Sequence, residues 1–386
     1  MQQKTIYTLA IIGSLLFSTS CVRANKDSET VENPPISNQK IQAAILLDVS
    51  NSMDGLIDQA KAQLWNMVST MGKAKCNGAS PKIEIALYEY GRTTNNEKAG
   101  FVKQLMPFTT DLDSLSQILF SLTTDGGDEY CGQVIYTSLN KLTWDNTPGN
   151  YKVIFIAGNE DFLQGNLHYK KACALAKQKG VIVNTIYCGD RMQGINEHWN
   201  VNDECGGGSF TNINQNERIV EIPTPYDDQI ITLNEKLNNT YIAYGSTGNS
   251  KWSSQKDIDG KNIAFDKSVA VKRATVKSNK ALYKNESWDM VDKYEEDKEI
   301  VSKINKATLA DSLRGKSDAE IQKIVIQKKK EREAIQKQIT ILNVSRDKFI
   351  AVEKSKVKNQ NNKATLETEI EKIIRKQAKE FNLVIE

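Results

Sequence analysis

The stretch that decides the fold is residues 44–53, Ala-Ile-Leu-Leu-Asp48-Val-Ser50-Asn-Ser52-Met. Its first four residues are apolar and end a run that begins at Ile41, which predicts a buried strand. Asp48, Ser50 and Ser52 then place three oxygen-bearing side chains in the turn before an amphipathic helix. Hard cations such as Mg²⁺ prefer oxygen ligands. The stretch therefore predicts a strand, a cation-binding loop and a helix in succession.

Around this stretch, apolar strand-like runs alternate with amphipathic helical runs as far as about Gly245. This alternation is typical of a parallel sheet covered by helices on both faces. Such a doubly wound sheet binds its ligand beyond the carboxyl ends of its strands, so we expect the chemistry just after Leu47, Ala157 and Tyr187. The predicted strands are residues 41–47, 82–90, 101–106, 151–157, 181–187 and 208–213, and the predicted helices are residues 55–71, 112–119, 132–142, 167–178 and 227–244.

The order of these elements, together with the Asp-x-Ser-x-Ser motif, resembles the von Willebrand factor type A (vWA) domain family over residues 40–245. Asp48, Ser50 and Ser52 match the first segment of that family's metal-ion-dependent adhesion site. The resemblance implies an α/β fold with a doubly wound, mostly parallel sheet flanked by helices. It also implies a bound Mg²⁺, or Ca²⁺ or Mn²⁺ in its place. A protein partner that offers an Asp or Glu would fill the open coordination position.

A second loop of the family supplies a Thr, or an acidic residue after a Gly-Gly pair. Here the loop at residues 123–129 reads Thr-Thr-Asp-Gly-Gly-Asp-Glu and runs into a predicted helix. The resemblance implies that Asp128 is the ligand from this loop, with Glu129 and Thr124 as alternatives. Tyr130, next to these acidic residues, either lines the metal face or packs in the interior.

The third segment of the motif departs from the family pattern, because Gly158 stands where an Asp is expected. In one interpretation, Asn159, Glu160 or Asp161 acts through a water molecule, and the carboxylate from the second loop supplies the missing charge. In the other, the site has decayed and binds metal weakly. Asp48 and one carboxylate from the second loop would still balance the charge of a divalent cation.

The amino-terminal residues have the features of a secretory signal. Lys4 precedes an apolar run at residues 6–17, which is too short to span a bilayer, and small residues then lead to Cys21. This pattern resembles a bacterial lipobox, which implies a signal peptide at residues 1–20. Lipidated Cys21 would then anchor the protein in the bacterial cell envelope, at the outer membrane. A plain secreted protein is the alternative, and residues 21–39 predict a flexible tether.

Disulfides are possible in an exported protein. Apart from Cys21, the chain has five cysteines, so at least one is free or pairs between molecules. Cys188 and Cys205 flank one loop and are the favoured pair. Zinc is the competing interpretation, but no CxxC occurs and His168 and His198 do not lie at ligand spacing from these cysteines.

The second half of the chain divides into two predicted parts. Residues 246–289 are polar and predict a connector, whereas residues 290–386 have helical periodicity and predict a helical, coiled-coil-like region broken near Gly315 and Gln360. The basic run at residues 328–332 is interleaved with Glu, which favours a solvated helix face over a patch for phosphate or lipid headgroups.

Composition and motifs exclude several classes of function. The net charge of +3, from 51 Lys and Arg against 48 Asp and Glu, argues against nucleic acid as a partner. Two histidines are too few for a His-rich metal enzyme, and no GxSxG, HExxH or GxGxxG motif is present. We therefore expect no enzyme. We expect a membrane-anchored, exported vWA domain that binds a protein partner through a divalent cation. The alternative is a metal-independent scaffold or structural lipoprotein that acts through its C-terminal helices.

Overall fold

The computed structural model describes residues 39–214, 216, 221–356 and 365–385. The predicted signal peptide, Cys21 and the tether up to residue 38 lie outside the described residues. Within these ranges, no helix combines the length and the apolar character that crossing a membrane requires.

A six-stranded sheet lies at the centre of the chain. Its strands are β1 (Lys40–Asp48), β3 (Lys82–Tyr90), β4 (Lys103–Thr109), β5 (Tyr151–Gly158), β6 (Ile182–Cys188) and β7 (Phe210–Ile213). Their order is β4-β3-β1-β5-β6-β7, and only β4 runs antiparallel to its neighbour. The order reverses at β1, as in a doubly wound sheet. The predicted α/β fold with a doubly wound, mostly parallel sheet is therefore confirmed.

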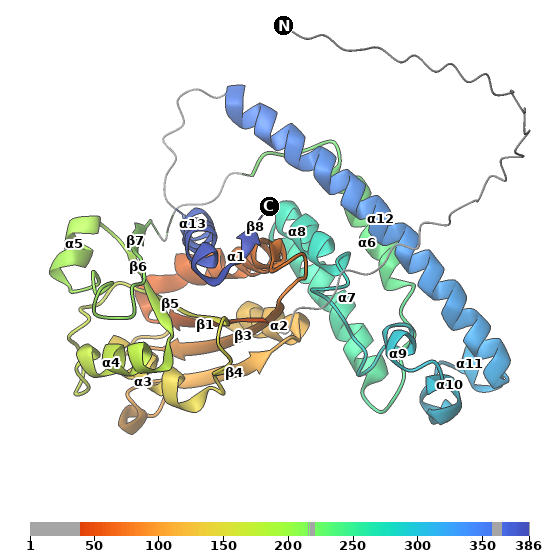
Figure 1. Cartoon of the computed structure of the whole chain (residues 1–386), viewed down its shortest axis with the longest axis horizontal. Coiled ribbons are helices and arrows are strands. Elements are labelled where there is room, and N and C mark those ends of the chain that lie inside the picture. Colours follow the sequence, from red (N-terminus) through yellow and green to blue (C-terminus); the bar gives the residue numbers. More distant parts are fainter. Residues whose placement is uncertain (1–38, 215, 217–220, 357–364, 386) are drawn as a thin grey trace, which may run out of the picture. The chain divides into compact units, whose positions relative to one another are not determined.

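Helices cover both faces of this sheet (Figure 1). Helices α1 (Asp54–Gly72) and α2 (Leu112–Ser121) pack on one face, and α3 (Cys131–Lys141) and α4 (Tyr169–Lys179) pack on the other. Alternate residues of β1 serve the two cores, so that Leu47 packs with α1 and Leu46 packs with α3. This double burial explains why the strand is apolar at successive positions.

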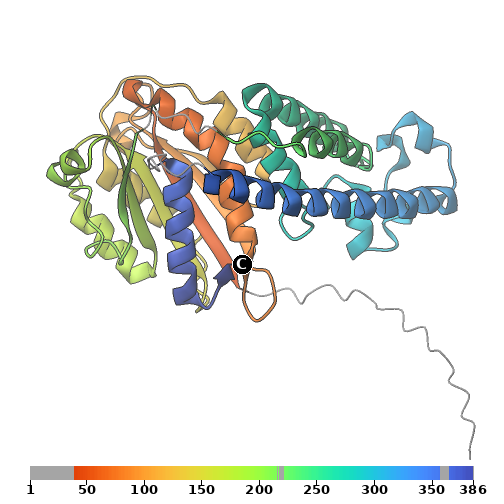
Figure 2. The same ribbon diagram turned by 90° about the horizontal axis from the view of Figure 1, so that it is seen from above.

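The last helix, α13 (Leu366–Ala378), belongs to the sheet domain and not to a separate tail. It lies beside α1 in Figures 1 and 2, and Ile370, Ile373 and Ile374 join the core on that face. The short strand β8 (Val384–Ile385) then pairs with β2 (Ala74–Lys75). The predicted helical region over residues 290–386 is thus divided, and its final part completes the sheet domain.

The described residues 221–356, between β7 and α13, form what we call the helical insert. The sheet domain on either side of this insert is held at Gln59, whose Nε2 donates to the carbonyl of Asn214 at 2.9 Å and whose Oε1 accepts from the N–H of Leu366 at 3.0 Å. The predicted polar connector is largely helical. The insert contains α6 (Asp227–Asn238), α7 (Gly248–Phe265), α8 (Lys267–Lys277), α9 (Met290–Glu296), α10 (Ile300–Lys303), α11 (Asp311–Arg314) and α12 (Asp318–Lys356).

A buried polar network fixes the insert to the sheet domain. The Arg273 guanidinium of α8 forms ion pairs with Asp113 of α2, at 2.7 Å, and with Asp259 of α7. It also lies over the ring of Trp65 in α1, 4.7 Å from the centroid. Because the Arg273 side chain is 1% exposed, these partners are needed to offset its desolvation.

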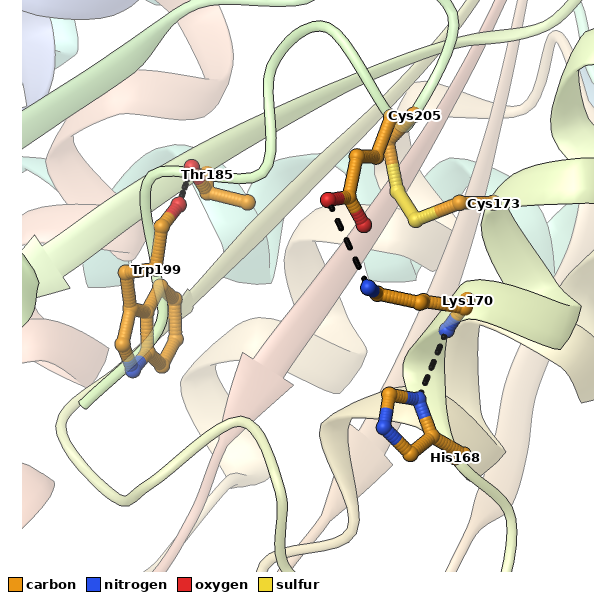
Figure 3. The surroundings of a disulfide bond; sticks show 7 residues. His168, Lys170, Cys173, Thr185, Trp199 and Cys205 are labelled. Atoms are coloured by element: carbon orange, nitrogen blue, oxygen red, sulfur yellow. Dashed lines mark hydrogen bonds and ion pairs between the residues drawn. A yellow bond between two sulfur atoms is a disulfide. The ribbon is translucent and has the colours of Figure 1, made fainter.

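The predicted disulfide between Cys188 and Cys205 is wrong. Cys205 forms a disulfide with Cys173 of α4, as Figure 3 shows. The reason is that Cys205 and Cys188 lie at opposite ends of β6. The Cys205 carbonyl accepts a hydrogen bond from the N–H of Val183 at the start of β6, whereas Cys188 is the last residue of that strand. Five residues of strand span about 16 Å, far more than a disulfide bridges. Among the described cysteines, Cys76, Cys131 and Cys188 are free.

Candidate metal centre

The first loop of the candidate site begins where β1 ends. Asp48 is the last residue of β1 and is fully buried. Its Oδ1 accepts a hydrogen bond from the N–H of Ser50 at 2.8 Å, which curls the chain back over the strand end. A single 3₁₀ turn, Asn51–Met53, then leads into α1. The local sequence thus folds as predicted, with a strand, a tight loop and a helix.

The two serine hydroxyls of this loop lie together. Ser50 Oγ and Ser52 Oγ are 3.4 Å apart. From the loop that follows β5, the side-chain amide of Asn159 donates to Ser52 Oγ at 3.3 Å. The structure therefore brings the three predicted residues of the first loop together, and adds an amide that the sequence suggested only as a water-mediated contact.

The second carboxyl group of the site belongs to Glu129. Its side chain is buried, and it faces Asp48 across Gly91, the residue after β3. A Cβ on Gly91 would lie 2.8 Å from Glu129 Cγ and 3.1 Å from Asp48 Oδ1. Gly91 also has a φ of +85°, which favours glycine. A glycine at this position lets the two carboxyl groups approach each other.

The other candidates from the second loop point elsewhere. Asp128 is exposed, and its Oδ2 accepts from the Tyr130 hydroxyl at 3.0 Å. The Thr124 hydroxyl donates to Asp54, in the first turn of α1. Of the three candidates, Glu129 alone is placed beside Asp48.

Gly158 is required by the packing around it. A Cβ at this position would lie 2.4 Å from the Tyr90 hydroxyl oxygen and 2.9 Å from Asp48 Oδ2. The Tyr90 hydroxyl donates to the Ala157 carbonyl at 3.0 Å and is held in that space. The Asp that the family resemblance implies would not fit here without displacing Tyr90. The sequence gives no signal for this, because Tyr90 lies on a different strand.

Burial raises the pKa of both carboxyl groups, because it disfavours their charged form. It raises the pKa of Asp48 to about 6, against the opposing effect of the hydrogen bonds from Ser50. Burial, with the nearby charges of Asp48 and Glu160, raises the pKa of Glu129 to about 8. Two buried carboxyl groups side by side cost free energy when both are charged. A cation between them would remove that cost.

The donor set of the site fits a hard cation. Asp48 Oδ2 and Asn159 Oδ1 are buried and have no hydrogen-bond partner among the described residues. Unpaired buried acceptors are costly and point to a missing donor or cation. In the described ranges no three His, Cys, Asp or Glu side chains gather as a metal cluster, so serine hydroxyls and an amide would have to complete the ligand set.

No protein-family model and no curated protein matches the chain. Solved structures that it resembles include proximal thread matrix protein 1 from the mussel byssus, described with a zinc-occupied MIDAS motif (13% identity, 45% of this chain, 41% of that chain, TM-score 0.34). Another is an aerotolerance-related membrane protein from Bacteroides fragilis (17% identity, 46% of this chain, 93% of that chain, TM-score 0.32). A third is a von Willebrand factor type A protein from Catenulispora acidiphila (12% identity, 45% of this chain, 38% of that chain, TM-score 0.33). The match spans about two fifths of the mussel protein. Likenesses of this size say nothing about function.

Proposed function

We propose that this vWA-type domain holds a divalent cation at Asp48, Ser50, Ser52 and Glu129 and binds a protein partner through it. One observation carries the proposal. The Asp48 carboxylate is fully buried, one of its oxygens has no partner among the described residues, and the carboxyl group of Glu129 is placed beside it. Burying two adjacent carboxyl groups without a positively charged partner costs free energy, and a bound cation would offset that cost.

The ligand chemistry favours Mg²⁺, with Ca²⁺ and Mn²⁺ as substitutes. Asp48 and Glu129 supply two negative charges, which balance one divalent cation. Ser50 and Ser52 supply neutral oxygens, and the unpaired Oδ1 of Asn159 is a further candidate. Mg²⁺ prefers oxygen ligands and keeps exchangeable positions. An Asp or Glu of the partner would occupy such a position, so the cation serves binding and not a chemical step.

Binding without catalysis is part of the proposal. Both histidines have structural partners: His168 Nδ1 accepts from the N–H of Lys170 at the start of α4, and His198 Nδ1 lies 3.0 Å from Asp161. Among the residues that the structure describes, neither histidine is paired with a Ser or Cys that could serve as a nucleophile, as catalysis of that type requires.

We further propose that the protein is exported and held in the bacterial cell envelope by lipidated Cys21, at the outer membrane. The sequence around Cys21 supports this location. The disulfide between Cys173 and Cys205 supports an oxidising compartment outside the cytosol.

Calorimetric titration of the full-length chain with Mg²⁺ tests the metal proposal. We expect binding heat and a rise in melting temperature, because a ligand that binds only the folded state stabilises it. Ser50→Ala should weaken binding roughly tenfold, as loss of a ligand or its supporting partner commonly does. Ser253→Ala, which changes an exposed serine on α7, is the control and should bind like the wild type. Absence of heat and of a melting shift in the wild type would overturn the proposal.

A metal-independent scaffold is the second candidate, and one observation favours it. Ile341, Val344 and Val352 on α12 are 56%, 50% and 53% exposed. Exposed apolar side chains at helical spacing can bind a partner. Partner capture that survives chelation of divalent cations but is lost in Ile341→Lys/Val344→Lys would support the scaffold over the metal bridge.

A further inference from the structure

We propose that Gln164 and Tyr130 are positioning residues that make Glu129, and not Asp128, the second carboxylate of the metal centre. The inference rests on the proposed function, since it concerns the same site. Glu129 lies in a segment without regular structure between α2 and α3. Contacts with other loops therefore decide which side chain of this segment faces Asp48.

Gln164 ties the main chain of Glu129 to the loop that follows β5. Its Oε1 accepts from the N–H of Glu129 at 3.3 Å, and its Nε2 donates to Glu160 Oε2 at 3.0 Å. A primary amide can do both because it carries a donor and an acceptor. One side chain thus fixes the peptide that carries Glu129 and holds the neighbouring carboxylate of Glu160.

The ring of Tyr130 is held between two glycines from two different loops. A Cβ on Gly165 would lie 2.7 Å from Tyr130 Cγ, and a Cβ on Gly100 would lie 3.2 Å from Tyr130 Cδ2. The two glycines have φ angles of +88° and +71°, a region that side chains disfavour. Phe101 adds an edge-to-face contact, with ring centroids 5.7 Å apart. The position of residue 130 is therefore fixed from several sides.

The same tyrosine keeps Asp128 away from the site. Its hydroxyl donates to Asp128 Oδ2 at 3.0 Å, and the Asp128 side chain is exposed. With residue 130 fixed and the carboxylate of residue 128 held outward, the residue between them faces the interior. Gln164 then holds its peptide in that orientation. Together these contacts determine which of two adjacent acidic residues can reach a cation.

Manganese titrations of the full-length chain, followed by electron paramagnetic resonance, test the inference. Gln164→Ala should weaken Mn²⁺ binding roughly tenfold, as loss of outer-shell partners commonly does. Glu129→Gln should weaken binding strongly in the wild-type background and much less in the Gln164→Ala background. Gln193→Ala is the matched control, because that amide hydrogen-bonds Glu197 and does not touch Glu129. Additive effects of the Gln164 and Glu129 substitutions would overturn the inference.

Tyr130→Phe tests the other half, since it keeps the ring and removes only the hydroxyl. In the wild type, Asp128→Asn should leave Mn²⁺ affinity unchanged. In Tyr130→Phe, the freed Asp128 competes for the cation, so Asp128→Asn should then change the affinity severalfold. If Asp128→Asn leaves the Mn²⁺ affinity unchanged in both backgrounds, the role assigned to Tyr130 is wrong.

A metal-free measurement separates failure of the inference from failure of the proposed function. Gln164→Ala should speed hydrogen exchange at the Glu129 amide, because it removes the acceptor of that N–H. If the wild type binds no Mn²⁺, the proposed function fails and so does the metal role of these residues. The exchange rate then still decides whether Gln164 holds Glu129, and an unchanged rate would show that it does not.

Discussion

At the scale of single residues, the site combines positions that local sequence predicts with positions that it does not. Asp48, Ser50 and Ser52 are spaced along one turn, so the chain itself brings them together. Glu129 was predicted only as an alternative to Asp128. The choice between them depends on Tyr130 and on other loops, which a linear pattern does not describe.

Gly158 leads to a prediction about stability. Gly158→Ala places a Cβ 2.4 Å from the Tyr90 hydroxyl oxygen and should lower the free energy of unfolding by about 1–3 kcal/mol. Tyr90→Phe removes that oxygen, so the same substitution should cost less in the Tyr90→Phe background. Urea unfolding of the two single variants and the double variant measures the difference. An equal cost in both backgrounds would mean that Tyr90 does not exclude the side chain.

The two carboxyl groups predict how stability without metal depends on pH. The folded state raises the pKa of Asp48 to about 6 and that of Glu129 to about 8, above ordinary values near 4. The folded state therefore binds protons more tightly than the unfolded chain. Stability from these groups is therefore fully present below about pH 4, and it is lost as the pH rises through the folded-state pKa values towards 8.

Melting temperatures between pH 4 and pH 8, measured in a chelator, check this prediction. Glu129→Gln should flatten the decline, because glutamine does not titrate. Saturating Mg²⁺ should also reduce it, since the cation favours the deprotonated carboxylates. A decline that is the same in Glu129→Gln would show that other groups cause it.

At the scale of elements, periodicity predicted each strand of the sheet and each helix that covers it through α4. It did not predict α7 and α8, because this part of the chain has few apolar residues and reads as polar. Their burial rests on ion pairs and amides, such as those of Arg273 and Asn262, whose partners are distant in sequence. The basic run of α12 similarly contains Arg332, which is buried and paired with Asp289 and not solvated.

Arg273 gives the prediction that belongs to this scale. Arg273→Met keeps most of the side-chain volume but leaves Asp113 and Asp259 buried without their cation. We expect a loss of about 3–5 kcal/mol in the free energy of unfolding. Lys261→Met is the control, because it breaks an exposed ion pair with Asp257 one turn away on α7. It should change the free energy of unfolding by less than about 1 kcal/mol. Denaturant titrations compare the two, and equal effects would argue against a network that secures the insert.

At the scale of the whole described chain, the sheet domain is assembled from two distant segments. Residues 40–213 supply the strands, and α13 supplies a helix of one face. Helical periodicity shows that α13 has an apolar face, but it does not show what that face packs against. The predicted division into a vWA-like domain at residues 40–245 and a helical region at residues 290–386 therefore misses that the two parts share a core.

Two deletions distinguish this arrangement from a domain with a dispensable tail. Deleting residues 290–386 removes α13, including Ile370 and Ile374, and exposes the core beneath it. We expect that variant to unfold.

Replacing residues 215–364 with about six Gly and Ser residues keeps α13, and a chain of that length spans roughly the short gap between Asn214 and Leu366. This variant should fold with reduced stability, because Trp65 and Asp113 lose their partners in the insert. Circular dichroism and Mn²⁺ affinity are the measurements. A folded 290–386 deletion with unchanged affinity would show that α13 is not part of the domain that carries the site.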